Sequence, residues 1–111
     1  MDIHVKKEVK GLIVSIIGKL DAVSAGEFDK EMDGQIKKGE SNFILDLSRL
    51  DYVSSAGLRS LLSTSKRLKE NKGTIVLCGL QGSVKEVFDI SGFSSLFTIY
   101  ESLENVLKGV S

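Results

Sequence analysis

Two neighbouring serines, Ser54 and Ser55, have the side-chain type and position best suited to chemistry in this sequence. They precede Ala56-Gly57-Leu58 at the expected start of an amphipathic helix. The first N–H groups of a helix lack partners within it, so a serine hydroxyl there can cap the helix. The same N–H groups and the helix dipole would also hold a phosphate. The residues alone allow a structural cap or a phosphorylated serine, and they favour the cap because capping serines are far commoner.

Other kinds of chemistry find little support in the sequence. The only histidine is His4, in a polar, alternating segment, and Ser55 is not flanked by the glycines of a nucleophile elbow. A small hydrolase that used Ser55 would therefore lack a base. One histidine and one cysteine do not make a metal site, and Gly57 is not followed by a Gly-Lys-Ser/Thr sequence. We therefore predict no enzymatic activity, no metal and no cofactor.

Length and charge indicate one domain, residues 1–111. Fifteen basic residues balance fifteen acidic ones, which gives no electrostatic case for binding nucleic acid. The single cysteine, Cys78, lies in an apolar run and is predicted to be a small buried hydrophobe. The N-terminus does not resemble a signal peptide, and no apolar run approaches the ~20 residues of a membrane span. These features predict a soluble cytoplasmic protein without a membrane segment.

Hydrophobic periodicity predicts a regular alternation of strands and helices. Ser24 with Glu27, and Ser83 with Glu86, are spaced as capping boxes for two of the helices. Since strands separated by helices pair in parallel, the fold class is α/β, a mixed and mainly parallel sheet with packed helices and an antiparallel hairpin at one edge. The predicted order is strand, strand, helix, strand, helix, strand, helix, strand, helix, over about 3–10, 12–18, 25–39, 42–47, 55–71, 74–79, 83–90, 97–100 and 102–108.

Three short motifs together resemble the STAS domain, specifically the small bacterial anti-sigma-factor antagonists. They are Gly18-Lys19-Leu20-Asp21, Asp46-Leu47-Ser48 and Val53-Ser54-Ser55-Ala56-Gly57-Leu58, in the family's order and spacing. The resemblance spans about residues 3–107. It implies that Ser55, directly before the small residue, is the phosphorylated serine. Many members have aspartate where this chain has Ser54, which leaves Ser54 as a second choice of acceptor.

The resemblance implies a partner switch. The unphosphorylated chain would bind an anti-sigma factor that is also a serine kinase of the histidine-kinase-like ATPase fold, and so free the sigma factor. Phosphorylation of Ser55 would reverse this binding, and a serine phosphatase would reset it. ATP and magnesium would belong to the kinase. The predicted partner-binding residues are Asp21, Ser54, Ser55, Ala56, Gly57 and Arg59, with Asp46 and Ser48 as supports.

One alternative within the same fold stays open. The chain could be a STAS scaffold subunit, in a stress-sensing complex or beside a transporter, without a phosphorylation cycle. The balanced charge is compatible with a monomer or a weak dimer.

Overall fold

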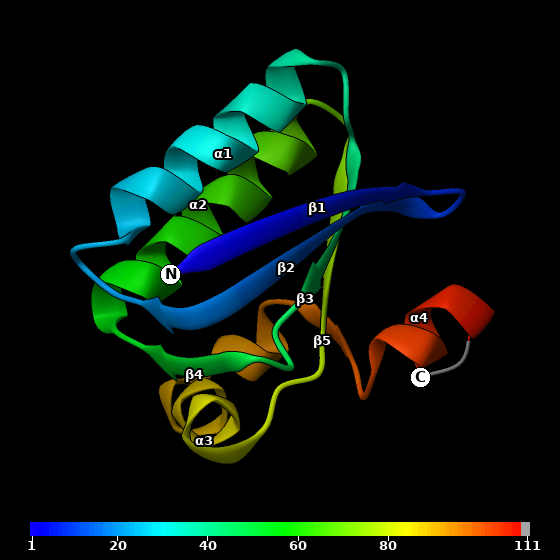
Figure 1. Ribbon diagram of the computed structural model, residues 1–111. Helices are drawn as coiled ribbons and strands as arrows, with labels where there is room; N and C mark the ends of the chain where they lie inside the picture. Colours follow the sequence, from blue (N-terminus) through cyan, green and yellow to red (C-terminus); the bar gives the residue numbers. More distant parts are fainter. Residues whose placement is uncertain (110–111) are drawn as a thin grey trace.

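A six-stranded sheet forms the centre of the molecule in a computed structural model, which describes residues 1–109. Figure 1 shows helices on both sides of this sheet. The strands are β1 (Asp2–Glu8), β2 (Gly11–Leu20), β3 (Asn42–Asp46), β4 (Leu50–Val53), β5 (Thr74–Cys78) and β6 (Thr98–Tyr100). The helices are α1 (Ala25–Lys37), α2 (Ser55–Glu70), α3 (Gly82–Ser91) and α4 (Leu103–Lys108), with a short 3-10 helix η1 (Phe93–Ser95).

The strand order confirms the predicted mixed sheet. β1 pairs antiparallel with β2, and the remaining pairs of the order β1-β2-β3-β5-β6 are parallel. Gly11 follows the hairpin turn with φ +151°, and a Cβ there would lie 2.5 Å from the Asn42 carbonyl oxygen. A larger residue at position 11 would therefore push β2 away from the start of β3.

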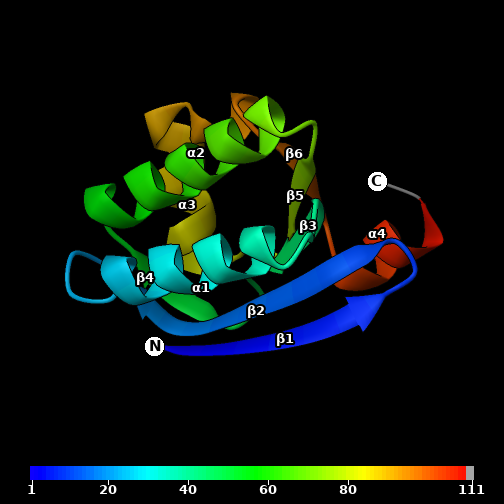
Figure 2. The same ribbon diagram turned by 90° about the horizontal axis from the view of Figure 1, so that it is seen from above.

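The two faces of the sheet have different covers. α1 and α2 lie side by side over one face, while α4 lies against the other (Figures 1 and 2). Alternation along β3 supplies both layers, because successive strand residues point to opposite faces. Phe43 and Leu45 join the larger core, and Ile44 packs with Cys78 and Val106 beneath α4. The first three helices contribute the buried apolar residues Phe28, Met32, Leu58, Leu61, Leu68, Val84 and Phe88 to this core.

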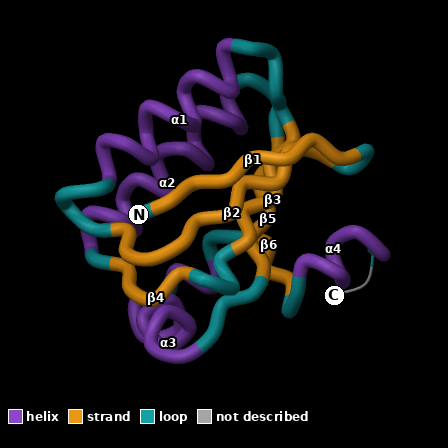
Figure 3. The backbone as a smooth tube through the Cα atoms, viewed as in Figure 1, coloured by secondary structure: helices purple, strands orange, loops and turns teal. Residues whose placement is uncertain are grey.

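Strand β4 corrects the predicted turn between the third strand and the second helix. It pairs in parallel with the end of β2, from Gly18 opposite Leu50 to Leu20 opposite Val53. In Figure 3, β4 lies apart from the central strands and above α3. Leu50 and Val53 are buried while the two residues between them are exposed. Buried residues three positions apart break strict strand alternation and match one turn of a helix instead, so sequence periodicity did not reveal the strand.

The second predicted capping box was wrong. Gln81 is the N-cap residue of α3, and it makes no side-chain cap hydrogen bond. The Ser83 hydroxyl instead donates to the Asp51 carbonyl oxygen at 3.4 Å. Ser83 therefore joins the start of α3 to β4 rather than capping its own helix.

Candidate functional site

The two serines at the start of α2 have separate environments. Ser54 is the N-cap residue, with extended backbone angles of φ −96° and ψ 174°. Its half-buried hydroxyl oxygen accepts a hydrogen bond from the Gly57 N–H at 3.3 Å. Ser54 therefore satisfies one of the unpaired N–H groups of the first helical turn.

Ser55 is the first residue of α2 and is exposed. Within residues 1–109 its hydroxyl makes no hydrogen bond. Because Ser54 supplies the cap, the Ser55 hydroxyl is available to a group that approaches from solvent. The structure thus assigns the cap to Ser54 and leaves the Ser55 hydroxyl exposed.

The end of β2 holds the start of α2 in place. The Ser54 N–H donates to the Leu20 carbonyl oxygen at 3.0 Å, which continues the pairing of Leu20 with Val53. Gly57 is buried against the same carbonyl: a Cβ on it would lie 2.4 Å from the Leu20 oxygen. Gly57 therefore lets the first turn of α2 lie directly on the end of β2.

Asp21 shapes the loop between β2 and α1. Its Oδ1 accepts hydrogen bonds from the N–H groups of Val23 at 3.0 Å and Ser24 at 3.1 Å. The hydrogen bond from the Ser24 N–H lowers the pKa of the Asp21 carboxyl below its ordinary value of 3.8, with Lys19 adding a smaller electrostatic effect. The other oxygen, Oδ2, accepts no hydrogen bond within residues 1–109. Asp21 is therefore ionised at neutral pH and has one oxygen free for a partner.

Ser24 does not form the predicted capping box. It is the residue before α1, but its backbone is already helical and its side chain makes no cap hydrogen bond. The Ser24 hydroxyl donates to the Lys19 carbonyl oxygen at 2.8 Å and accepts from the Asp21 N–H at 3.0 Å. Ser24 therefore closes the same loop that Asp21 organises.

The remaining predicted contact residues differ in exposure. Arg59 is exposed and lies one helical turn after Ser55, on the same face of α2. Ala56 is half-buried, and Gly57 lies below the surface. Gly57 was predicted to touch a partner, but it is buried, and a Cβ added to it would meet Leu20 and Val53. The absence of a side chain at position 57 allows α2 to lie close to the end of β2.

Two exposed apolar residues beside this site were missed from the sequence. Val23, at the tip of the Asp21 loop, is 93% exposed, and Tyr52 on β4 is 48% exposed. Tyr52 pairs with Lys19, two residues before Asp21. An apolar residue inside the polar loop Asp21-Ala22-Val23-Ser24 was the available signal for Val23. For Tyr52 no signal existed, because β4 itself was not predicted.

Asp46 and Ser48 lie at the other end of β4 from the serines. The Asp46 Oδ1 accepts from the Ser48 N–H at 3.1 Å and so closes the turn after β3. Within residues 1–109 no hydrogen bond joins Asp46 or Ser48 to Ser54 or Ser55. Asp46 and Ser48 shape the turn that leads into β4, and their support of the site stays a prediction.

Cys78 behaves as predicted. It is fully buried beneath α4, and burial, with a smaller effect of Asp46, raises the pKa of its thiol to about 12. Its sulfur contacts the Leu45 carbonyl oxygen at 3.6 Å. Among the residues that the structure describes, no group of three or more His, Cys, Asp or Glu side chains could hold a metal ion.

Comparison with known proteins identifies the family. A family model described as the STAS domain matches residues 1–106. This chain belongs to the STAS domain family. BtrV of Bordetella bronchiseptica, whose name puts it among anti-sigma factor antagonists, is 42% identical over 98 residues, which cover 87% of this chain and 84% of BtrV.

Solved structures share the fold of this STAS domain. An anti-sigma factor antagonist from Mycobacterium paratuberculosis has a TM-score of 0.86 at 21% identity, over 98% of this chain and 92% of that one. SpoIIAA of Bacillus in its phosphorylated form has a TM-score of 0.74 at 18% identity, over 99% of this chain and 100% of that one. The unphosphorylated form of SpoIIAA also has a TM-score of 0.74, at 16% identity, over 97% of this chain and 96% of that one.

No helix within residues 1–109 of this STAS domain is both long enough and apolar enough to cross a membrane.

Proposed function

We propose that this chain is an anti-sigma-factor antagonist whose binding to its partner is switched off by phosphorylation of Ser55. The observation that favours this function is the division of labour at the start of α2. Ser54 caps the helix, and the exposed hydroxyl of Ser55 is free. The 42% identity to BtrV supports an anti-sigma factor as the partner class.

The fold can accept a phosphate at Ser55. A phosphoserine adds about −1.5 to −2 charges at neutral pH. At the first position of α2 that charge lies at the positive end of the helix dipole. Arg59, one turn further along, brings a guanidinium to the same face. Phosphorylation should therefore leave the domain folded.

The same charge opposes binding. The partner would cover Ser55 together with the Asp21 loop, and the Asp21 carboxylate is ionised at neutral pH. A phosphate enclosed beside that carboxylate would lose its hydration and face a like charge. A penalty of about 3 kcal/mol would weaken binding more than a hundredfold.

Exposed apolar side chains supply a reason for the unphosphorylated surface to bind. Val23 and Tyr52 flank the acceptor region and expose most and about half of their surfaces, respectively. Tyrosine is a frequent binding anchor once a partner encloses it, and burial of an exposed valine removes further apolar surface from water. The contact surface we propose is therefore Asp21, Val23, Tyr52, Ser55 and Arg59, with Ser54, Ala56 and Gly57 positioning it.

The proposed cycle places all catalysis in other proteins. The anti-sigma factor is proposed to be a serine kinase of the histidine-kinase-like ATPase fold, which supplies ATP and magnesium, and a serine phosphatase removes the phosphate. The chain itself acts by binding and needs no cofactor. Its proposed place of action is the bacterial cytoplasm, as a monomer or weak dimer.

The test compares Ser55→Ala with the matched variant Ser54→Ala, both expressed in the cells that make the protein. Mass spectrometry should find phosphate on Ser55 in the natural chain and in Ser54→Ala, and none in Ser55→Ala. Ser55→Ala should also retain its partner with and without phosphatase treatment of the lysate. Phosphate on Ser54 would contradict the assignment. Partner binding of equal strength with and without phosphate would favour a STAS scaffold subunit without a phosphorylation cycle.

A further inference from the structure

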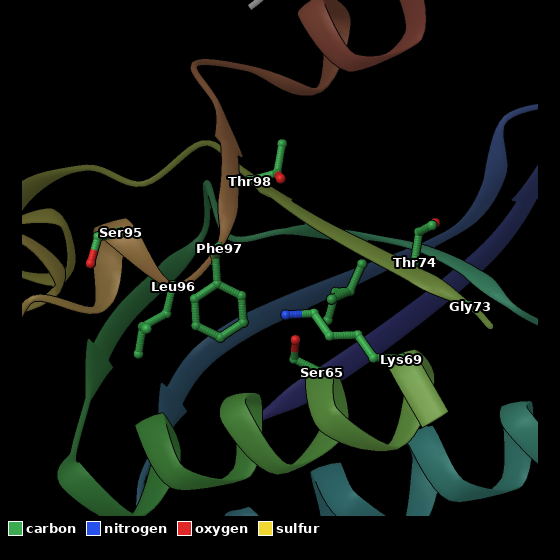
Figure 4. Close-up of a pocket in the computed structure, with 9 residues that line it drawn as sticks. Ser65, Lys69, Gly73, Thr74, Ser95, Leu96, Phe97 and Thr98 are labelled. Atoms are coloured by element: carbon green, nitrogen blue, oxygen red, sulfur yellow. The ribbon is translucent and has the colours of Figure 1, made fainter. Parts of the chain in front are cut away.

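A cleft of about 330 Å³ lies near the C-terminal end of α2, away from Ser55. Figure 4 shows it between α2, the start of β5 and the segment that leads into β6. Its volume equals roughly that of eleven liquid waters, within the range of small-molecule pockets. Its lining residues are Ser65, Lys69, Gly73, Thr74, Ile75, Ser95, Leu96, Phe97 and Thr98.

The polar lining of this cleft suits an anion. Lys69 supplies a positive charge and has no ion pair within residues 1–109. Ser65, one turn before Lys69, is only 3% exposed, and Figure 4 shows its hydroxyl beside the Lys69 ammonium. Within residues 1–109 no acidic residue lines the cleft. The chain has equal numbers of acidic and basic residues, so a lysine without a carboxylate beside it gives this cleft a local excess of positive charge.

A smaller cleft also contains a lysine without a carboxylate beside it, but that Lys10 ammonium already donates to the Val106 carbonyl oxygen at 3.4 Å. Two more clefts carry negative charge. The cleft at the C-terminal ends of β3 and β5 is lined by the carboxylates of Asp46, Glu101 and Glu104. The groove between α3 and β6 includes Asp89, which is already paired with Lys85. Neither surface offers an unpaired cation to an anion.

One wall of the Lys69 cleft is apolar and planar. The Phe97 ring stacks on Phe93 with centroids 6.4 Å apart and an interplanar angle of 28°. Figure 4 shows the Phe97 ring next to the Lys69 ammonium. Leu96, beside it, is 48% exposed although it is apolar. A ligand that lies against Phe97 and Leu96 would have its charged end close to Lys69.

From these observations we propose that the Lys69 cleft binds a small anion that has an aromatic or other planar apolar group. The anionic group is held by the Lys69 ammonium and the Ser65 hydroxyl, and the planar group lies against Phe97 and Leu96. Ser65 lies ten positions after Ser55 on α2, a rise of about 15 Å along the helix. The cleft can therefore be occupied while a partner covers Ser55, and this proposal does not depend on the proposed function.

The experiment titrates phenyl phosphate into the isotopically labelled full chain and follows its backbone amide NMR signals. Saturable shifts are expected at Ile75, Phe97 and Thr98. Lys69→Gln should weaken binding about tenfold, the effect of losing one hydrogen bond to a charged group. The matched variant Lys66→Gln removes an exposed lysine of α2 outside the cleft and should bind as the natural chain does.

Two further probes separate the charge from the planar group. Benzyl alcohol, which lacks the charge, and inorganic phosphate, which lacks the ring, should each bind more weakly than phenyl phosphate. If benzyl alcohol bound as tightly as phenyl phosphate, the role of the charge would be overturned. If inorganic phosphate bound as tightly, the role of the planar group would be overturned. An equal loss in Lys66→Gln and Lys69→Gln, or shifts that do not saturate, would overturn the site itself. Thermal melts of both variants should match that of the natural chain.

Discussion

Replacement of Gly57 by alanine tests the close contact between α2 and the end of β2. A Cβ at position 57 would lie 2.4 Å from the Leu20 carbonyl oxygen and 3.0 Å from side-chain atoms of Leu20 and Val53. The oxygen belongs to the backbone, so no rotamer change relieves the clash. Since carbon atoms pack about 3.5 Å or more from their neighbours, the start of α2 would have to move by about 1 Å.

The magnitude follows from three effects. Overpacking of a dense core costs about 1–3 kcal/mol. The movement also weakens the hydrogen bond from the Ser54 N–H to the same Leu20 oxygen, which contributes about 1 kcal/mol. Alanine returns about 1 kcal/mol through its higher helix propensity. The free energy of unfolding should therefore fall by about 2 kcal/mol, a drop of about 8 °C in the melting temperature of a domain of this size.

Urea denaturation of Gly57→Ala and Gly26→Ala, followed by circular dichroism, measures this effect. Gly26 is a matched control because it also lies in the first turn of a helix, α1, but a Cβ on it would have no heavy atom within 4 Å. Gly26→Ala should be stabilised by up to about 1 kcal/mol. If Gly57→Ala were as stable as the natural chain, the steric argument would be refuted. An equal loss in Gly26→Ala would show a general effect of these helix starts instead.

Three further substitutions test individual side chains. Asp21→Ala should lower the melting temperature because two loop N–H groups lose their acceptor, whereas Asp21→Asn should retain most stability and change mainly partner affinity. Because the pKa of Asp21 is lowered in the folded state, its carboxylate stabilises the fold at pH values above the ordinary pKa of 3.8. This stabilisation is lost as the pH falls through the folded-state pKa, so the stability of Asp21→Asn should fall less on acidification than that of the natural chain. Ser54→Ala should cost about 1 kcal/mol in urea denaturation through the lost cap, and equal stability would contradict the capping role. Thr64→Val should raise the urea midpoint of unfolding, because the Thr64 hydroxyl is buried without a hydrogen-bond partner within residues 1–109. A fall of more than about 1 kcal/mol in the free energy of unfolding would instead indicate that the hydroxyl is hydrogen-bonded, for example to a buried water.

The main elements were predictable because their signals are local. Apolar runs gave the buried strands, and the apolar spacing in α1 and α2 gave their inward faces, including Phe28 and Leu61. The hairpin at Gly11 and the parallel order of the later strands followed from the lengths of the connections. These features depend on residues a few positions apart, which a sequence shows directly.

The errors at β4 and Ser83 involve contacts between distant segments, while the error at Ser24 involves a carbonyl oxygen five residues earlier. β4 has only two buried residues, and it exists because the end of β2 offers a free edge to pair with. Ser24 and Ser83 have the spacing of capping residues, but the carbonyl oxygens of Lys19 and Asp51 accept from their hydroxyls instead. A hydroxyl takes the nearest acceptor in space, and sequence spacing does not show where that acceptor lies.

The sequence by itself determined the fold class, the family resemblance, and a serine pair at the start of a helix. Only the tertiary structure decided which serine caps the helix. The cap falls to Ser54 because the Leu20 carbonyl oxygen fixes its N–H, and Gly57 lets α2 approach that carbonyl closely. Ser55 is left exposed as a consequence. The capping residue is the one at which the backbone enters the helix. In this chain that residue is fixed by the contacts of Ser54 and Gly57 with Leu20, more than thirty residues earlier.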